Sequence, residues 1–426
     1  MVLNIFLCSL KHFRLFVFYL LLLPSELAKK IYSMVVPLST TFLLLVFLVA
    51  STVANNPRIF RISASSLYVA GFKHGTLAKD LIRSAFQLPE FETMRAFVSK
   101  SEVGKTAFAR LIKDNTIQFP GLVEEMLGTA AGAAVPVEDI WMANLVTEIE
   151  SLMKEEKAHC SDIYAARRED GTVSHGHNED WSSTLKPYWY ILSLTALPGS
   201  NFSSCGGMAY PGTMVGFAAT WNAHGVYSTQ NTLFPRPTRG YGLASTLAQR
   251  IANCGPIGKG PFNIVDNIDE FSTLLHTKNW AASASLNVVD LNHQKMANIE
   301  VYEDGYSRYD VQGNYSHFNM FKHLKIGIQH DEGDNSTRHR QKRVNELPPP
   351  STTHDIRNIL GDTQDQAYPI YRDITLSTLV LNGKTKTLEV WIDQNPSLSS
   401  SDPFFSFHLP TFFTTTGTNE EQEDPS

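Results

Sequence analysis

The spacing of apolar and polar positions changes near residue 160. Before it, the chain is predicted to be mostly helical over residues 67–159. In residues 122–131 apolar pairs recur every four positions with polar pairs between them, as on an amphipathic helix. Pro136, followed by two acidic residues, is typical of the first turn of another helix that runs toward Met153.

After residue 160 the apolar period becomes two, which is typical of strands. Strands are predicted at residues 188–197, 214–221, 226–232, 284–291, 297–302, 306–311, 377–381 and 387–392. Asn382-Gly383 is a strong hairpin turn, and a helical pattern returns between Arg338 and Leu360. Helices followed by antiparallel hairpins indicate an α+β fold. Two hairpin sheets covered by helices would form a four-layer sandwich.

The N-terminus has the pattern of a targeting segment rather than of the fold. Lys29 and Lys30 precede an uncharged run over 34–54 that ends in small residues. This predicts a signal peptide or an uncleaved signal anchor within residues 1–54, with Met34 as an alternative start. Under either reading the rest of the chain enters the lumen, which leaves secreted, lysosomal and membrane-anchored destinations open.

Glycosylation motifs agree with this route, with acceptor sites at Asn201, Asn314 and Asn335. At the other end, the acidic residues 414–426 are predicted to be disordered.

Bulk composition narrows the class of protein. A chain of 426 residues with 43% hydrophobic content can bury a large core. The formal charge of −6 and the lack of a long basic tract argue against a nucleic-acid partner. A charged fraction of 18% suits a compact enzyme better than a disordered scaffold.

The cysteine count draws attention to Cys160. Without the leader three cysteines remain, and an oxidising compartment tends to pair thiols. Cys205 and Cys254 are the natural pair if either forms a bridge, which would leave Cys160 free. The alternative is that all three are small buried hydrophobic residues.

The residues around Cys160 suit a nucleophile that becomes a new chain terminus when the protein cuts its own backbone. A thiol must lose its proton to a nearby base before it attacks. Cleavage of the 159–160 bond would supply that base as an α-amine with a pKa of about 7.7–8.0, close to about 8.5 for the thiol. The spacing to Asp180 allows one strand out, a turn at 169–171 and one strand back. Asp180 would then orient the new amine, unless it merely caps a turn.

The candidate hydrogen-bond donors to a developing oxyanion are three asparagines near strand ends: Asn222, Asn231 and Asn287. Asn222 fits the alternative role of a turn former. Asn287 lies within a predicted strand, where a polar residue needs a reason, so it is favoured as the donor.

The remaining charged motifs are less specific. The basic run 338–343 is either a solvated helix face or a source of one inward arginine, since Arg338 and Arg340 cannot both point inward. His175 and His177 would share one face of a strand, but no nearby cysteine or further histidine completes a metal ligand set. Neither a metal nor a cofactor is predicted.

Motifs in one order along residues 67–410 resemble the acyl-coenzyme A:6-aminopenicillanic acid acyltransferase family of N-terminal cysteine hydrolases. The matching segments are 71–75, 125–132 with 138–140, Cys160, 176–181, 222–226, 285–287 and 336–338. Two departures stand out. His159 replaces the usual glycine before the nucleophile and is bulky enough to slow the acyl shift, and Val146 replaces a frequent arginine.

The resemblance implies the αββα fold of N-terminal-nucleophile hydrolases and a cut between His159 and Cys160. Residues 55–159 would form a mostly helical α chain or pro-segment, and residues 160–413 a catalytic β chain. The implied catalytic residues are Cys160, Asp180 and Asn287, and the implied substrate-binding residues are Asn222, Ser336, Arg338 and Arg340.

The function expected from this resemblance is cleavage of a linear amide of a small N-acyl amine through a thioester on Cys160. Water would release an acid, or an amine would take the acyl group. The expected partners are thus a small-molecule amide or acyl donor and the two chains of one precursor. The alternatives are a lumenal lipid-amide hydrolase, similar to acid ceramidase, and an inactive secreted binding protein with the same fold.

Overall fold

The chain divides into two units, Met1–Asn56 and Pro57–Ser426. The computed structural model describes residues 58–154, 159–166, 171–235, 238–255, 265–276, 279–326, 335–398 and 400–414. The predicted signal segment and residues 415–426 of the predicted tail lie outside this part of the chain. Within it, no helix is both long and apolar enough to cross a membrane.

Helices dominate the first part of the second unit, as the spacing of apolar residues predicts. They are α3 (Leu67–Leu77), α4 (Lys79–Ala85), α5 (Pro89–Lys100), α6 (Glu102–Gln118), α7 (Pro120–Ala133), α8 (Val137–Asn144) and α9 (Val146–Met153). Four more follow: α10 (Ser245–Cys254), α11 (Ile268–Leu275), α12 (Asn335–Glu346) and α13 (Thr353–Leu360). Short 3₁₀ turns cover Ser183–Leu185 and Leu409–Thr411.

Helices α3 and α7 pack with their backbones in contact. A Cβ added at Gly71 would lie 1.9 Å from the carbonyl oxygen of Glu125, and one added at Gly128 would lie 2.2 Å from that of Tyr68. Only glycine allows this approach. Close packing of the two helices therefore explains the glycines at positions 71 and 128, which belong to the motifs that resemble the acyltransferase family.

Strands form two sheets. The eight-stranded sheet has the order β1 (Ile59–Ala64), β4 (Tyr190–Ala196), β5 (Cys205–Ala209), β6 (Thr220–Asn222), β7 (Val226–Leu233), β8 (Trp280–Asp290), β9 (Lys295–Glu303), β10 (Gly305–Asp310). The six-stranded sheet has the order β11 (Tyr315–His317), β2 (Ser161–Ala166), β3 (Val173–Asp180), β12 (Thr375–Asn382), β13 (Thr387–Ile392), β14 (Phe405–His408). Every pairing is antiparallel except β1 with β4.

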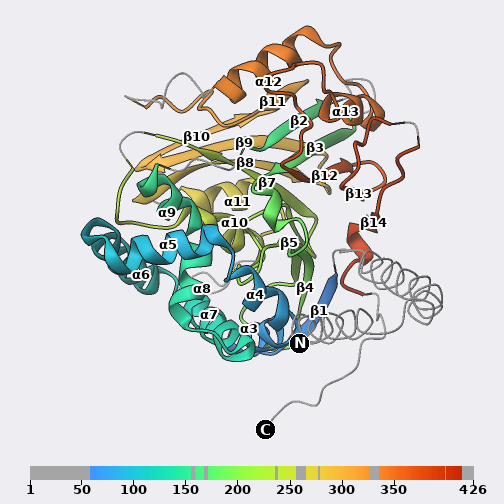
Figure 1. Cartoon of the computed structure of the whole chain (residues 1–426). Coiled ribbons are helices and arrows are strands. Elements are labelled where there is room, and N and C mark those ends of the chain that lie inside the picture. Colours follow the sequence, from blue (N-terminus) through green and yellow to red (C-terminus); the bar gives the residue numbers. More distant parts are fainter. Residues whose placement is uncertain are drawn as a thin grey trace, which may run out of the picture. The chain divides into compact units, whose positions relative to one another are not determined.

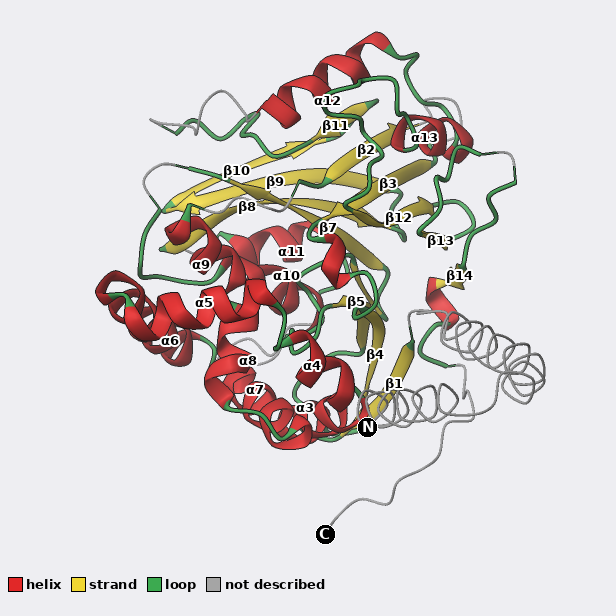
Figure 2. Ribbon diagram, viewed as in Figure 1, coloured by secondary structure: helices red, strands yellow, loops and turns green. Residues whose placement is uncertain are grey.

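The two sheets lie face to face between helices, which gives the predicted α+β sandwich in four layers (Figure 1). Helix α13 packs on β2, β3 and β12, and helices α10 and α11 pack on the outer face of the larger sheet. Figure 2 shows α12 and α13 on one side of the two layers of strands and the other labelled helices on the opposite side. The face of each sheet that turns toward the other is therefore closed off from solvent.

Two predicted elements differ from the structure. The strand expected over 214–221 is reduced to β6, because Gly216 adopts φ +122°. There the chain packs against helix α10 so closely that a Cβ would lie 2.4 Å from Cα of Arg250. The helix expected from Pro136 toward Met153 breaks at Leu145 into α8 and α9.

Candidate active site

Strands β2 and β3 form the hairpin that the spacing between Cys160 and Asp180 predicts. Ser161 lies opposite Asn178, and the backbone N–H of His159 donates to the carbonyl of Asp180 at 3.1 Å. The bond between His159 and Cys160 is therefore held against the end of β3. Residues 169 and 170 of the expected turn lie outside the described residues.

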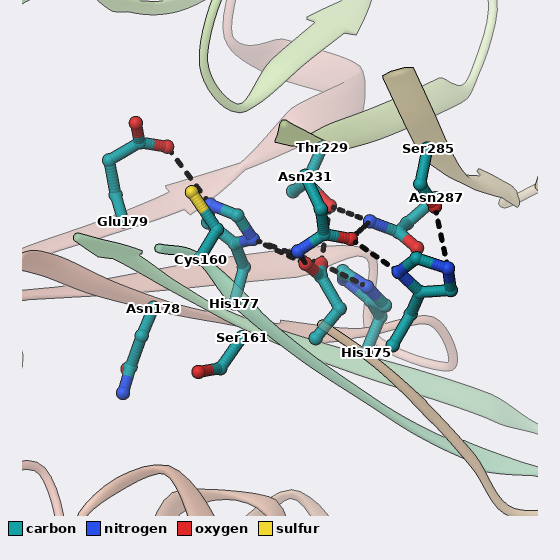
Figure 3. Close-up of polar contacts among 12 residues, drawn as sticks. Cys160, Ser161, His175, His177, Asn178, Glu179, Thr229, Asn231, Ser285 and Asn287 are labelled. Carbon is teal, nitrogen blue, oxygen red and sulfur yellow. Dashed lines mark hydrogen bonds and ion pairs between the residues drawn. The ribbon is translucent and has the colours of Figure 1, made fainter. Parts of the chain in front are cut away.

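Alternation along this hairpin decides which side chains meet. Ile163 and Ala165 pack under helix α13 in a small apolar cluster. Cys160 and Asp162 consequently face the larger sheet, and so do His177 and Glu179 on the neighbouring strand. Figure 3 shows Ser161 and Asn178 pointing away to the opposite side of the hairpin.

Cys160, His177 and Glu179 form a compact buried cluster. The Cys160 sulfur and a ring nitrogen of His177 lie within 4.8 Å of each other, and Nε2 of His177 lies 2.9 Å from Oε2 of Glu179. Burial and the Glu179 carboxylate raise the pKa of the Cys160 thiol to about 11, although the nearby His177 ring opposes this. As long as Cys160 has no amine of its own, its thiol is thus protonated at neutral pH.

His177 is held between two carboxylates. Burial opposes the charged ring, but Asp162, hydrogen-bonded to Nδ1 at 2.9 Å, raises the pKa of His177 well above its ordinary value. Burial likewise opposes ionisation of Asp162, yet its pKa falls below the usual range because His177 and His175 lie beside it. His175 Nε2 is 3.0 Å from Oδ1 of Asp162.

This cluster corrects the expectation that no cysteine lies near the two histidines. One ligand atom from each of Cys160, His177 and Glu179 falls within 4.8 Å of the other two. The His-x-His pair alone could not show this, because the cysteine comes from the other strand of the hairpin.

Two arginines converge on the peptide bond before Cys160. The carbonyl oxygen of His159 accepts hydrogen bonds from Nη1 of Arg340 at 3.0 Å and from Nη2 of Arg372 at 3.1 Å. Arg340 also donates to the carbonyl of Cys160 at 2.7 Å. Oγ of Ser336 accepts from Arg372 at 2.9 Å, so this predicted pocket residue supports the arginines.

Asp180 is fully buried at the end of β3. One carboxylate oxygen receives Nε and Nη2 of Arg372 at 3.2 and 3.0 Å, and the other receives the hydroxyl of Thr375 at 2.6 Å. Asp180 therefore forms an ion pair beside the 159–160 bond and does not cap a turn.

Arg338 and Arg340 are separated as helix geometry requires. Arg340 is fully buried at the 159–160 bond, whereas Arg338 is on the exposed face of α12. The expectation that Arg338 binds substrate is thus corrected. Asn222 is also corrected, because its Oδ1 accepts from the backbone N–H groups of His224 and Val226 at 3.0 Å each, which is a turn-forming role.

Asn287 lies in the polar network between the sheets, but neither of its N–H groups is directed at Cys160. Its Nδ2 donates to Oγ1 of Thr229 at 3.2 Å and to Oδ1 of Asn231 at 2.9 Å. Asn231 in turn donates to Asp162 at 2.6 Å. Asn287 is therefore connected to the thiol indirectly, through Asn231 or Thr229 to Asp162 and then His177 (Figure 3), which does not fit the predicted direct donor.

The other predicted positions have simple outcomes. Cys205 and Cys254 form a disulfide with a Cα–Cα distance of 5.5 Å, and Cys160 is the free cysteine of the described residues. The three predicted glycosylation sites are all exposed: Asn201, Asn314 and Asn335.

Several residues of the site were not predicted. Asp162 and Glu179 share the face of Cys160 by simple alternation, so the strand period could have identified them. Arg372 and Tyr210 come from distant segments and had no local signal. Tyr210 donates its hydroxyl to Oε1 of Glu179 at 2.7 Å.

A pocket opens beside this cluster. Its wall includes Tyr210 and Trp181, which follows Asp180 in sequence, and Val146. The other lining residues are mainly apolar, with Glu90, Glu150, Ser182 and Thr213 as the polar exceptions. The valine at position 146, which replaces an arginine that is frequent in the family, therefore affects the pocket.

Taken together, a buried thiol beside a doubly hydrogen-bonded peptide carbonyl within an αββα sandwich is the arrangement expected of an N-terminal-nucleophile enzyme. The profile of the acyl-coenzyme A:6-aminopenicillanic acid acyl-transferase family matches residues 166–396, more than half of the chain. The chain belongs to this family. It is accordingly an enzyme of the amide hydrolase and acyltransferase class that acts on non-peptide amides.

Individual relatives are distant. The chain is 22% identical over 379 residues to the beta-alanyl-dopamine/carcinine hydrolase of Drosophila melanogaster, covering 78% of this chain and 91% of the relative. Among solved structures, a Caenorhabditis elegans N-acylethanolamine-hydrolyzing acid amidase ortholog matches with a TM-score of 0.34 and 14% identity, over 57% of this chain and 95% of that one. Penicillin V acylase from Agrobacterium tumefaciens matches with a TM-score of 0.33 and 12% identity, over 55% and 83% of the two chains.

Proposed function

We propose that the protein cuts itself between His159 and Cys160 and then uses Cys160 to cleave linear amides of small N-acyl amines through a thioester. The observation that carries this proposal is the pair of arginine hydrogen bonds to the carbonyl oxygen of His159. Negative charge develops on this oxygen when a nucleophile attacks its carbon. Donors already aimed at it lower the barrier to that attack.

The first stage is an N→S acyl shift. Sγ of Cys160 attacks the carbonyl carbon of His159, and the thiol proton passes to the departing backbone nitrogen as the C–N bond breaks. Water then hydrolyses the thioester, which restores the thiol and leaves a carboxylate on His159. The products are an α chain that ends at His159 and a β chain that begins with the α-amine of Cys160.

The second stage uses that amine as the base. Its ordinary pKa of about 7.7–8.0 is far better matched to proton transfer at neutral pH than an isolated buried thiol. Asp180 is beside the bond that becomes this terminus and would orient the amine. The amine takes the thiol proton, sulfur attacks the substrate carbonyl, and the proton leaves with the released amine product. Water or a second amine then takes the acyl group from sulfur.

The substrate class is inferred from the pocket and from the relative. A mainly apolar wall suits a small, mainly apolar ligand. β-Alanyl amines, the substrates in the name of the Drosophila relative, have an ammonium group at the acyl end. We therefore take β-alanyl-dopamine and carcinine as the first compounds to test.

The test is a panel of amides assayed with the purified full-length protein and its Cys160→Ala variant. The panel contains the two β-alanyl amines, an N-acylethanolamine and a ceramide. The proposal expects hydrolysis of β-alanyl amines only by the protein with Cys160. Hydrolysis of the lipid amides alone would support a lipid-amide hydrolase. Equal ligand binding by both proteins without turnover would support a binding protein.

A secretory route is part of the proposal. Three exposed sequon asparagines and the Cys205–Cys254 disulfide support it, since disulfides persist in oxidising compartments. Expression in animal cells should give a product whose apparent mass falls after endoglycosidase treatment. An unshifted band confined to the cytosol would contradict this route.

A further inference from the structure

The cluster around Cys160 has a second chemical property besides nucleophilicity. We propose that Cys160, His177 and Glu179 form a Zn²⁺ site with one open coordination position. Zn²⁺ binds cysteine sulfur, histidine nitrogen and carboxylate oxygen, and three protein ligands with an open fourth position are common for it. The metal would occupy the sulfur that amide cleavage requires, so the site makes the enzyme inhibitable by Zn²⁺. Only this last consequence rests on the proposed function.

The geometry of the three ligands needs little adjustment. Their ligand atoms all lie within 4.8 Å of one another, and Nε2 of His177 is 2.9 Å from Oε2 of Glu179. Two ligands about 2.0–2.1 Å from a tetrahedral ion are about 3.4 Å apart. Binding would therefore separate this pair by a few tenths of an ångström and draw the sulfur in.

The groups behind the ligands are the independent observation that points to a metal. Histidine ligands of metals usually donate their other ring nitrogen to a carboxylate, and carboxylate ligands are themselves hydrogen-bonded. Both contacts exist here: Asp162 is 2.9 Å from Nδ1 of His177, and the Tyr210 hydroxyl is 2.7 Å from Oε1 of Glu179. These contacts leave His177 Nε2 and Glu179 Oε2 directed toward each other at the thiol.

Proton balance follows from the same contacts. Binding of Zn²⁺ replaces the thiol proton of Cys160 and the proton on Nε2 of His177. The ring keeps the proton on Nδ1 that Asp162 accepts. The two displaced protons go to solvent, so no redox partner or further reactant is required.

The site is tested by titrating purified full-length protein with Co²⁺ and then Zn²⁺. We expect one equivalent of Co²⁺ to give a thiolate-to-cobalt charge-transfer band in the near ultraviolet, and Zn²⁺ to remove it. The Cys160→Ala variant should lack the band. The outer-shell variants Asp162→Asn and Tyr210→Phe should bind about 10–100-fold more weakly. Asp362→Asn is the control, because it removes a carboxylate that pairs with Arg343 outside the cluster, and it should bind normally.

Alkylation of wild-type protein tests the site without a variant, so the result does not depend on whether a variant folds. Zn²⁺ should protect Cys160 from iodoacetamide, measured on the Cys160 peptide by mass spectrometry. The proposal is overturned if no charge-transfer band forms and Zn²⁺ does not slow alkylation. It is equally overturned if Cys160→Ala binds Zn²⁺ as tightly as wild type. Amide hydrolysis by a protein that fails these tests would leave the proposed function standing.

Discussion

Removing the Arg372 guanidinium is expected to slow self-cleavage while leaving the fold intact. Arg372 donates one of the two arginine hydrogen bonds to the His159 carbonyl, at 3.1 Å, and its partner Arg340 is unchanged in the variant. Arg372 is also less buried than Arg340, with 13% of its side chain exposed. Arg372→Gln is therefore the more informative substitution.

The size of the effect follows from the loss of one donor. Loss of one hydrogen-bond donor to a developing oxyanion slows a reaction by about 100–1000-fold, or about 3–4 kcal/mol. Arg372→Lys keeps the charge but loses the fork that also holds Asp180, so it should process at an intermediate rate. Arg343→Gln is the matched control. It breaks a similar paired contact with Asp362, which does not involve the 159–160 bond, and should process normally.

The assay is a time course of cell-free translation of the full chain, with uncut chain and β fragment separated by electrophoresis. A double-mutant cycle with Asp180→Asn separates two explanations, because Arg372 also pairs with that carboxylate. If Arg372 acts on the His159 carbonyl, Arg372→Gln slows processing by the same factor with Asp180 or Asn at position 180. Processing of folded Arg372→Gln at the wild-type rate would refute the reasoning.

Three further predictions concern charge. Glu179→Gln removes a carboxylate that raises the pKa of Cys160, so the pH midpoint for iodoacetamide alkylation of the uncut chain should fall below about 11; an unchanged midpoint contradicts this. Burial raises the pKa of Glu148 to about 7. Folded protein therefore holds a proton that unfolded protein loses above about 4.5, and stability should fall by up to about 3 kcal/mol as the pH rises from 4.5 to beyond 7. Glu148→Gln should remove this trend from thermal unfolding; an identical pH profile of Tm refutes it. Val146→Arg should raise KM for carcinine by adding positive charge to the pocket, whereas an unchanged KM would exclude the pocket as the cation site.

The fold could be predicted further than the site. The change of apolar period near residue 160 separates the helical segment from the sheets, because burial on one face imposes a period that the residues display directly. Strand β6 was misplaced because Gly216 and helix α10 determine that path. A contact between distant segments does not change the spacing of apolar residues, so the sequence pattern cannot show it.

The residues of the site also divide into those that the sequence could predict and those that only contacts between distant segments bring together. Cys160 and Asp180 could be paired from their spacing, since a hairpin brings such residues together. Asn287 was chosen for being polar within a strand, but strand position says nothing about which neighbours use its hydrogen bonds. Arg372 precedes β12, and only the pairing of β12 with β3 brings it to Asp180.

The central claim is that Cys160 becomes a chain terminus and then carries the acyl group. Intact-mass analysis and N-terminal sequencing of the purified protein test it most directly. The account predicts a fragment that begins Cys160-Ser161-Asp162-Ile163 and that gains a hydroxylamine-sensitive acyl group when mixed with substrate. A single uncut chain, with amide hydrolysis that persists in Cys160→Ala, would contradict it.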